Sequence, residues 1–123
     1  MTLRTPKIPN SEHPITIAPV RQRVEVRAGG TVIARSQAAL ALRESTYRTI
    51  YYIPVSDVDQ ALLRPGDTHS YCPYKGKASY ASVDLGERVI EDAVWFYPEP
   101  YEAVAGIKNH VAFNPDRVQI TVS

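Results

Sequence analysis

The chain has 123 residues, with 14 lysines and arginines against 13 aspartates and glutamates, so its formal net charge is +1. This length predicts one domain with its own core. The near balance of charges excludes an overall positive potential that would attract nucleic acid or an anionic membrane. A single cysteine, which cannot form an internal disulfide, is typical of a reducing compartment. No apolar run approaches the roughly 20 residues of a membrane span, and residues 1–7 lack the apolar run of a secretory signal, so we expect a cytoplasmic protein.

The first part of the chain differs in composition from the rest. Residues 1–14 contain prolines and few large apolar side chains, which predicts an extended N-terminal arm. Residues 15–123 are predicted to form a single β-rich domain.

Alternating apolar and polar residues dominate the start of this domain. The alternation over residues 15–18 and 23–27 predicts two strands, and Gly29-Gly30 is typical of a hairpin turn before a return strand over residues 31–35. Later elements follow with turn signals between them. Strands are predicted over residues 40–44, 47–53, 68–72, 77–84, 89–97, 111–113 and 118–122, with a short helix over 56–63 and a helical turn over 101–105. The sequence therefore predicts a mainly β fold: a bent antiparallel sheet or half-open barrel with one or two short helices.

The segment Cys72-Pro73-Tyr74-Lys75-Gly76 is the most distinctive candidate site. Proline presets the backbone of a turn and glycine permits a positive φ, so a thiol and an ammonium group are held close together. Two interpretations remain open. Cys72 is either a small buried hydrophobe or a nucleophilic thiolate whose pKa the nearby Lys75 lowers.

Glu44 follows Leu40 and Leu42 on one face of its predicted strand. An isolated buried carboxylate is costly, so an inward Glu44 must be paired or protonated, and we expect Lys75 as its partner. The alternative is that Glu44 is solvated where the strand leaves the core. If it is buried, a structural ion pair and a catalytic acid or base remain equally open.

Aromatic residues gather on the strands beside the Cys72 turn. Tyr52, Tyr80, Trp95 and Tyr97 either pack within the core or line a small-molecule pocket with their polar tips. A metal site is not expected: His69 and Cys72 have metal-ligand spacing, but strand alternation places them on opposite faces.

Along most of its length the chain resembles a known family, the domain of unknown function 427, through segments that match in the same order. This family is described as having a β-tent fold and is sometimes labelled nucleotidyltransferase-like. The matching segments are His13–Ile17, Gly30–Ser36, Leu40–Glu44, Tyr51–Pro54, Asp57-Val58, Cys72–Gly76, Ala78, Tyr80, Ala93–Tyr97 and Val111–Phe113. The resemblance implies a single mainly β domain whose site groups Cys72, Lys75 and Glu44 with the aromatic residues. No clustered carboxylates support nucleotidyl transfer.

Three functions follow as hypotheses. The first is a small-molecule-binding domain in which Lys75 anchors an anionic or carbonyl group. The second is an enzyme with Cys72 as nucleophile, assisted by Lys75 or Glu44. The third is a structural or interaction protein. No motif identifies a cofactor; we expect no nucleic-acid or membrane partner, and a homodimer would be the commonest assembly.

Overall fold

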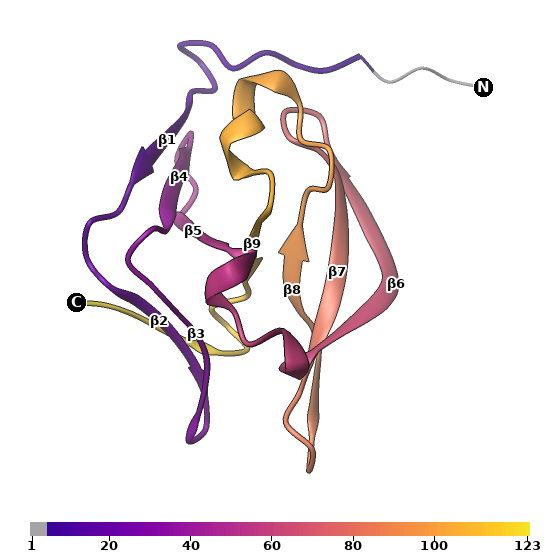
Figure 1. Cartoon of the computed structure of the whole chain (residues 1–123). Coiled ribbons are helices and arrows are strands. Elements are labelled where there is room, and N and C mark those ends of the chain that lie inside the picture. Colours follow the sequence, from indigo (N-terminus) through magenta and orange to yellow (C-terminus); the bar gives the residue numbers. More distant parts are fainter. Residues whose placement is uncertain (1–4) are drawn as a thin grey trace.

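The computed structural model describes residues 5–123 as two antiparallel β-sheets (Figure 1). Their strands are β1 (Ile15–Pro19), β2 (Val24–Ala28), β3 (Thr31–Ser36), β4 (Leu40–Glu44), β5 (Ile50–Pro54), β6 (Leu63–Cys72), β7 (Gly76–Asp84), β8 (Val89–Phe96), β9 (His110–Phe113) and β10 (Gln119–Val122). The 3-10 helices are η1 (Val55–Asp57), η2 (Gln60–Leu62) and η3 (Glu102–Ile107). One sheet has seven strands in the order β1-β4-β5-β9-β8-β7-β6, and the other has three in the order β10-β2-β3. The mainly β prediction is confirmed.

The seven-stranded sheet is bent and open. Its edges are β1 and β6, so hydrogen bonds between described strands do not close it into a barrel. Register shifts interrupt β6–β7 between Pro65 and His69, and β7–β8 between Ala81 and Val83. Because such bulges increase the local twist, they help to bend the sheet, and Figure 1 shows β4 and β7 on opposite sides of the molecule.

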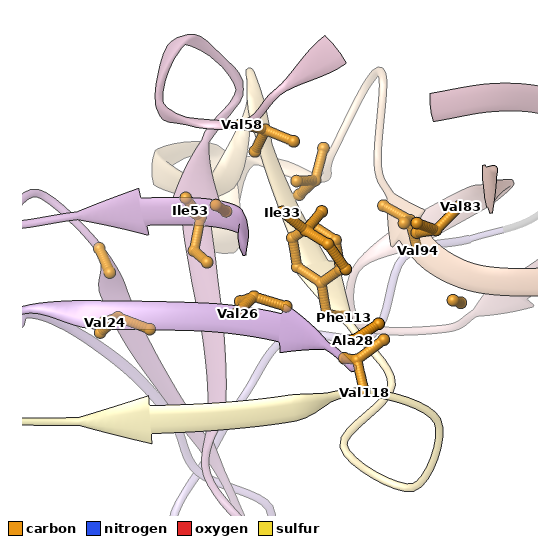
Figure 2. Close-up of a cluster of buried hydrophobic side chains, with 14 of the residues drawn as sticks. Val24, Val26, Ala28, Ile33, Ile53, Val58, Val83, Val94, Phe113 and Val118 are labelled. Carbon is orange, nitrogen blue, oxygen red and sulfur yellow. The ribbon is translucent and has the colours of Figure 1, made fainter. Parts of the chain in front are cut away.

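Two hydrophobic clusters lie on opposite faces of this sheet. The larger one packs the sheet against the three-stranded sheet and includes Val24, Ile53 and Phe113 (Figure 2). The second includes Leu42, Tyr52, Ala112 and, from η3, Val104 and Ile107. Adjacent residues of β9 enter different clusters, because successive side chains of a strand point to opposite faces. The face with the second cluster carries the candidate site.

The first hairpin agrees with its prediction. Val24 and Val26 are fully buried, β2 pairs with β3, and Gly29 has a φ of 58°, which the turn requires.

The single helix predicted over residues 56–63 is wrong. The structure has η1 and η2 instead, separated by Val58, which forms a β-bridge with Ala34. The Asp59 side chain accepts a hydrogen bond from the Ala61 amide, so it caps only the short η2. Tertiary pairing with β3 therefore overrides the local helix signals. The strand predicted over residues 68–72 is longer in the structure, because β6 begins at Leu63, where the helix was expected to end.

Among residues 5–123 no helix combines the length and apolar character needed to cross a membrane.

Glu25 supplies a prediction about acid stability. Hydrogen bonds from Arg27 and Arg35 hold the pKa of its carboxyl at about 2, against an ordinary 4.5. A lowered pKa in the folded state contributes stability above the unfolded pKa, and this is lost as the pH falls from about 4.5 to about 2. The melting temperature of wild type should exceed that of Glu25→Gln at neutral pH. Thermal unfolding at a series of pH values should show this difference shrinking as the pH falls through the window. A constant difference would contradict it.

Candidate functional site

A cavity of about 520 Å³ opens on the face of the seven-stranded sheet that carries the second cluster. Six of the seven predicted site residues line it: Glu44, Tyr52, Lys75, Tyr80, Trp95 and Tyr97. The structure thus brings the predicted aromatic and charged groups together in one place.

Strand register explains how the aromatic residues meet. Tyr52 and Trp95 both pair with Ala112 of β9, and Tyr80 pairs with Trp95, so these residues form one row across four strands. The small side chain of Ala112 separates the two large rings. The Trp95 indole nitrogen donates a hydrogen bond of 3.3 Å to the Tyr52 hydroxyl over this gap.

Glu44 and Lys75 form an ion pair next to the aromatic row. Both side chains are largely buried, at 10% and 11% exposure, so of the two alternatives for Glu44 the structure has the buried, paired one. Burial alone would raise the pKa of the Glu44 carboxyl, but hydrogen bonds from Lys75 and His13, with their charges, hold it below its usual value. The carboxylate is therefore ionised at neutral pH.

This ion pair connects distant parts of the sheet. Glu44 ends β4, which is next to one edge, whereas Lys75 lies in the turn between β7 and β6 at the other edge. Backbone hydrogen bonds leave the sheet open, and the two side chains bridge its open side beside the cavity.

The site contains a histidine that no local sequence signal indicates. His13 lies in the arm, and its Nε2 is 2.7 Å from the second carboxylate oxygen of Glu44. Its ring stacks on Tyr74 at a centroid distance of 4.0 Å and an interplanar angle of 6°. The arm reaches the same turn through the Lys7 amide, which donates to the Pro73 carbonyl at 2.8 Å. Figure 1 shows the arm crossing above the sheet from β1 towards β6 and β7.

Backbone contacts fix the turn that carries Lys75. The Lys75 amide donates to the Cys72 carbonyl at 3.2 Å, and the Lys75 carbonyl accepts from the Tyr101 amide at 3.0 Å. Gly76 has a φ of 109°, a conformation that favours glycine.

Gly76→Ala should therefore destabilise the protein more than a matched change at Gly86, whose φ is also positive. A Cβ at Gly76 would lie 3.3 Å from the Glu99 carbonyl oxygen, whereas one at Gly86 meets nothing within 4 Å. We expect a loss of about 1 kcal/mol for Gly86→Ala and about 2 kcal/mol or more for Gly76→Ala. Urea unfolding of both variants measures the difference; equal losses would contradict the contact argument.

Cys72 takes a different position from the other predicted residues. It is a free, half-buried thiol that packs against the second cluster and is not among the residues lining the cavity.

Other cavity residues gave no usable signal in the sequence. They are Leu42, Tyr47, Arg48, Ile50, Asp92 and Asn114. Asp92 has a φ of 51° next to the β7–β8 register shift and accepts a hydrogen bond from the Thr68 hydroxyl. A bulge of this kind depends on tertiary pairing, which strand alternation does not reveal.

A wider groove of about 910 Å³ lies beside β6 and contains none of the seven predicted site residues. His69 lies there with its Nδ1 3.3 Å from the Ser79 hydroxyl. No cluster of three or more histidine, cysteine, aspartate or glutamate side chains suited to a metal ion occurs within the described part of the chain.

Comparison with known proteins identifies the family. No curated protein matches the chain. A family model described as a domain of unknown function, DUF427, matches residues 16–123, which include every strand from β2 onward and nearly all of β1. The chain, with its bent sheet and its Cys72–Gly76 turn, therefore belongs to the DUF427 family.

Proposed function

We propose that this domain binds a small molecule in the cavity between Tyr52, Tyr80, Trp95 and Tyr97. In this proposal Lys75 holds an anionic or carbonyl group of the ligand, and Glu44 orients Lys75 through a charge-assisted hydrogen bond.

The Tyr97 hydroxyl is the observation that carries the proposal. Tyr97 is 6% exposed, and no described residue forms a hydrogen bond with its hydroxyl. A hydroxyl cut off from water without a partner costs about 1–3 kcal/mol, so an unpaired tyrosine hydroxyl is expected to face water or a ligand. Within the described chain no fully enclosed side-chain nitrogen or oxygen lacks a partner, so this hydroxyl reaches open space, and Tyr97 lines the cavity.

The cavity is lined by hydrogen-bond donors and by two carboxylates, and the carboxylates already have partners: Glu44 bonds to Lys75 and His13, and Asp92 accepts from Thr68. Burial raises the pKa of Tyr52 to about 12 and also raises that of Tyr97, so both hydroxyls keep their protons at neutral pH. Tyr52 accepts from Trp95, and its own proton has no acceptor among the described residues. Lys75 carries two further N–H donors besides the one directed at Glu44. A ligand that offers acceptor oxygens, such as a carboxylate or a carbonyl, complements this set.

Trp95 supplies the assay, because it is the only tryptophan in the chain. Titration with benzoate should shift its indole N–H signal in a two-dimensional nitrogen–proton NMR spectrum, and the shift should saturate. Cyclohexylammonium, a cation of similar size, should leave the signal in place. Native mass spectrometry of freshly purified protein would then search for a natural ligand.

Tyr97→Phe should weaken benzoate binding about ten-fold, because it removes one hydrogen bond to a charged group. Tyr101→Phe is the matched control, since Tyr101 lines the groove beside β6 and bonds to Tyr71 instead. If benzoate leaves the Trp95 signal unmoved and native spectra contain only the bare chain, the cavity is not a ligand site.

A structural role for the Cys72–Gly76 turn has its own support. The Glu44–Lys75 ion pair and the stack of His13 on Tyr74 join the two sides of an open sheet. This role is compatible with ligand binding, because the same side chains that bridge the sheet also border the cavity.

A further inference from the structure

We propose that His13 makes the anion affinity of this cavity depend on pH, because its imidazole and the Lys75 ammonium group share the Glu44 carboxylate. The inference rests on the proposed binding function and assigns the N-terminal arm a positioning role in it.

The shared carboxylate is the first observation. One oxygen of Glu44 bonds to Lys75, and the other lies 2.7 Å from His13 Nε2. The exposed fractions of the His13, Glu44 and Lys75 side chains are 23%, 10% and 11%. Charges that are this far removed from water are screened less than surface charges. A change in the charge of His13 therefore alters the electrostatic potential at Lys75.

The second observation is that His13 is held in place rather than loosely attached. Its ring stacks on Tyr74 and meets Tyr47 edge-on at a centroid distance of 6.3 Å. The Asn10 side chain accepts a hydrogen bond of 2.9 Å from the His13 amide, and the next carbonyl, that of Pro14, accepts from the Ser45 amide at 2.8 Å.

The surroundings of His13 set the direction of the effect. The titratable or charged groups around it are Glu44 of β4, Tyr74 and Lys75 of the β6–β7 turn, Tyr47 of the β4–β5 connection, and Glu12 and Lys7 of the arm, with the Lys7 ammonium 6.0 Å from the centre of the Tyr74 ring. Glu44 is the only carboxylate bonded to the imidazole among these described groups. When the His13 ring carries a second proton, its positive charge and that of Lys75 therefore share the single negative charge of Glu44.

The charge of the cluster follows from these contacts. With neutral His13, the charges of Glu44 and Lys75 cancel. Histidine ordinarily gains its charge between about pH 8 and pH 5, and Glu44 stays ionised there because its pKa is lowered. Protonation then leaves the cluster with one net positive charge beside the cavity. Anion affinity should rise on acidification, and by reciprocity a bound anion should make His13 hold its proton more tightly.

The test follows benzoate binding through the Trp95 indole signal from about pH 8 to about pH 5.5, where histidine titrates and benzoate stays ionised. In wild type we expect binding roughly ten-fold tighter at the acidic end. His13→Gln keeps a hydrogen-bond donor towards Glu44 but cannot titrate, so its affinity should be nearly independent of pH. His110→Gln is the control: His110 lines another hollow and bonds to the Lys108 carbonyl, so it should keep the wild-type profile.

A second measurement needs no substitution. Proton–carbon NMR of the His13 ring in wild type should show its titration moving to higher pH when benzoate is present. Benzoate binding that does not vary with pH, a pH dependence that persists in His13→Gln, or a His13 titration unaffected by benzoate would each overturn the role of His13 while leaving the binding function intact. Absence of benzoate binding at every pH, together with native mass spectra that contain only the bare chain, would overturn both.

Discussion

Lys75→Met should destabilise the protein by up to about 3–5 kcal/mol, since removing one partner of a buried ion pair leaves the Glu44 carboxylate with His13 as its remaining partner. Lys75 and Glu44 are 11% and 10% exposed, so water can replace the lost partner only from the side of the cavity. The substitution also removes the bridge across the open side of the sheet. Urea unfolding at neutral pH measures the loss.

Lys77→Met is the matched control, because Lys77 is exposed and lies two residues further along the same turn and strand. It should cost less than about 1 kcal/mol. Adding Glu44→Leu to Lys75→Met should recover part of the stability, since an apolar pair no longer buries a lone charge. A Lys75→Met loss no larger than that of Lys77→Met would mean that the pair is solvated and does not bridge the sheet.

The Glu44–Lys75 pair was predictable from the sequence because two independent constraints coincide. Alternation from Leu40 and Leu42 directs Glu44 inward, and burial of a carboxylate requires a cation. Lys75, fixed in a proline–glycine turn, is the cation expected for an inward Glu44, and in the structure Glu44 is buried and paired with Lys75.

His13 was not predictable in the same way. Its segment has no periodic pattern and precedes a proline, so local signals indicate only an extended arm. Its position follows from contacts with Tyr74 and Glu44, which lie far away in the sequence. The first four residues of the predicted arm lie outside the part of the chain that the structure describes.

The sheet arrangement illustrates the same limit. Most strands were predicted close to their observed bounds, because period-two patterns and turn residues are local signals. The placement of β9 between β5 and β8, and of β10 in a separate sheet, depends on pairing between distant segments. The arrangement of the cavity residues could not be predicted for the same reason, because Ala112, the small residue that separates Tyr52 from Trp95, belongs to β9.

Phe113→Ala should cost about 3–5 kcal/mol of unfolding free energy, the range for removing a buried aromatic side chain without collapse of the space it leaves. Phe113 is 2% exposed and lies among Ile33, Ala28 and Val118 between the two sheets (Figure 2). Val89→Ala is the control at a half-exposed position and should cost far less. Urea unfolding of both variants provides the comparison.

The same variant tests whether the two faces of the sheet are separate. Phe113 belongs to the cluster between the sheets, whereas its neighbour Ala112 belongs to the cluster beside the cavity. The folded Phe113→Ala protein should therefore retain the wild-type Trp95 indole signal and its benzoate affinity despite the lost stability. Phe113→Leu, which refills most of the volume, should recover much of the stability. A Phe113→Ala loss below about 1 kcal/mol would mean that packing between the sheets contributes little to the stability of the fold. A displaced Trp95 signal would mean that the two faces of the sheet are not separate.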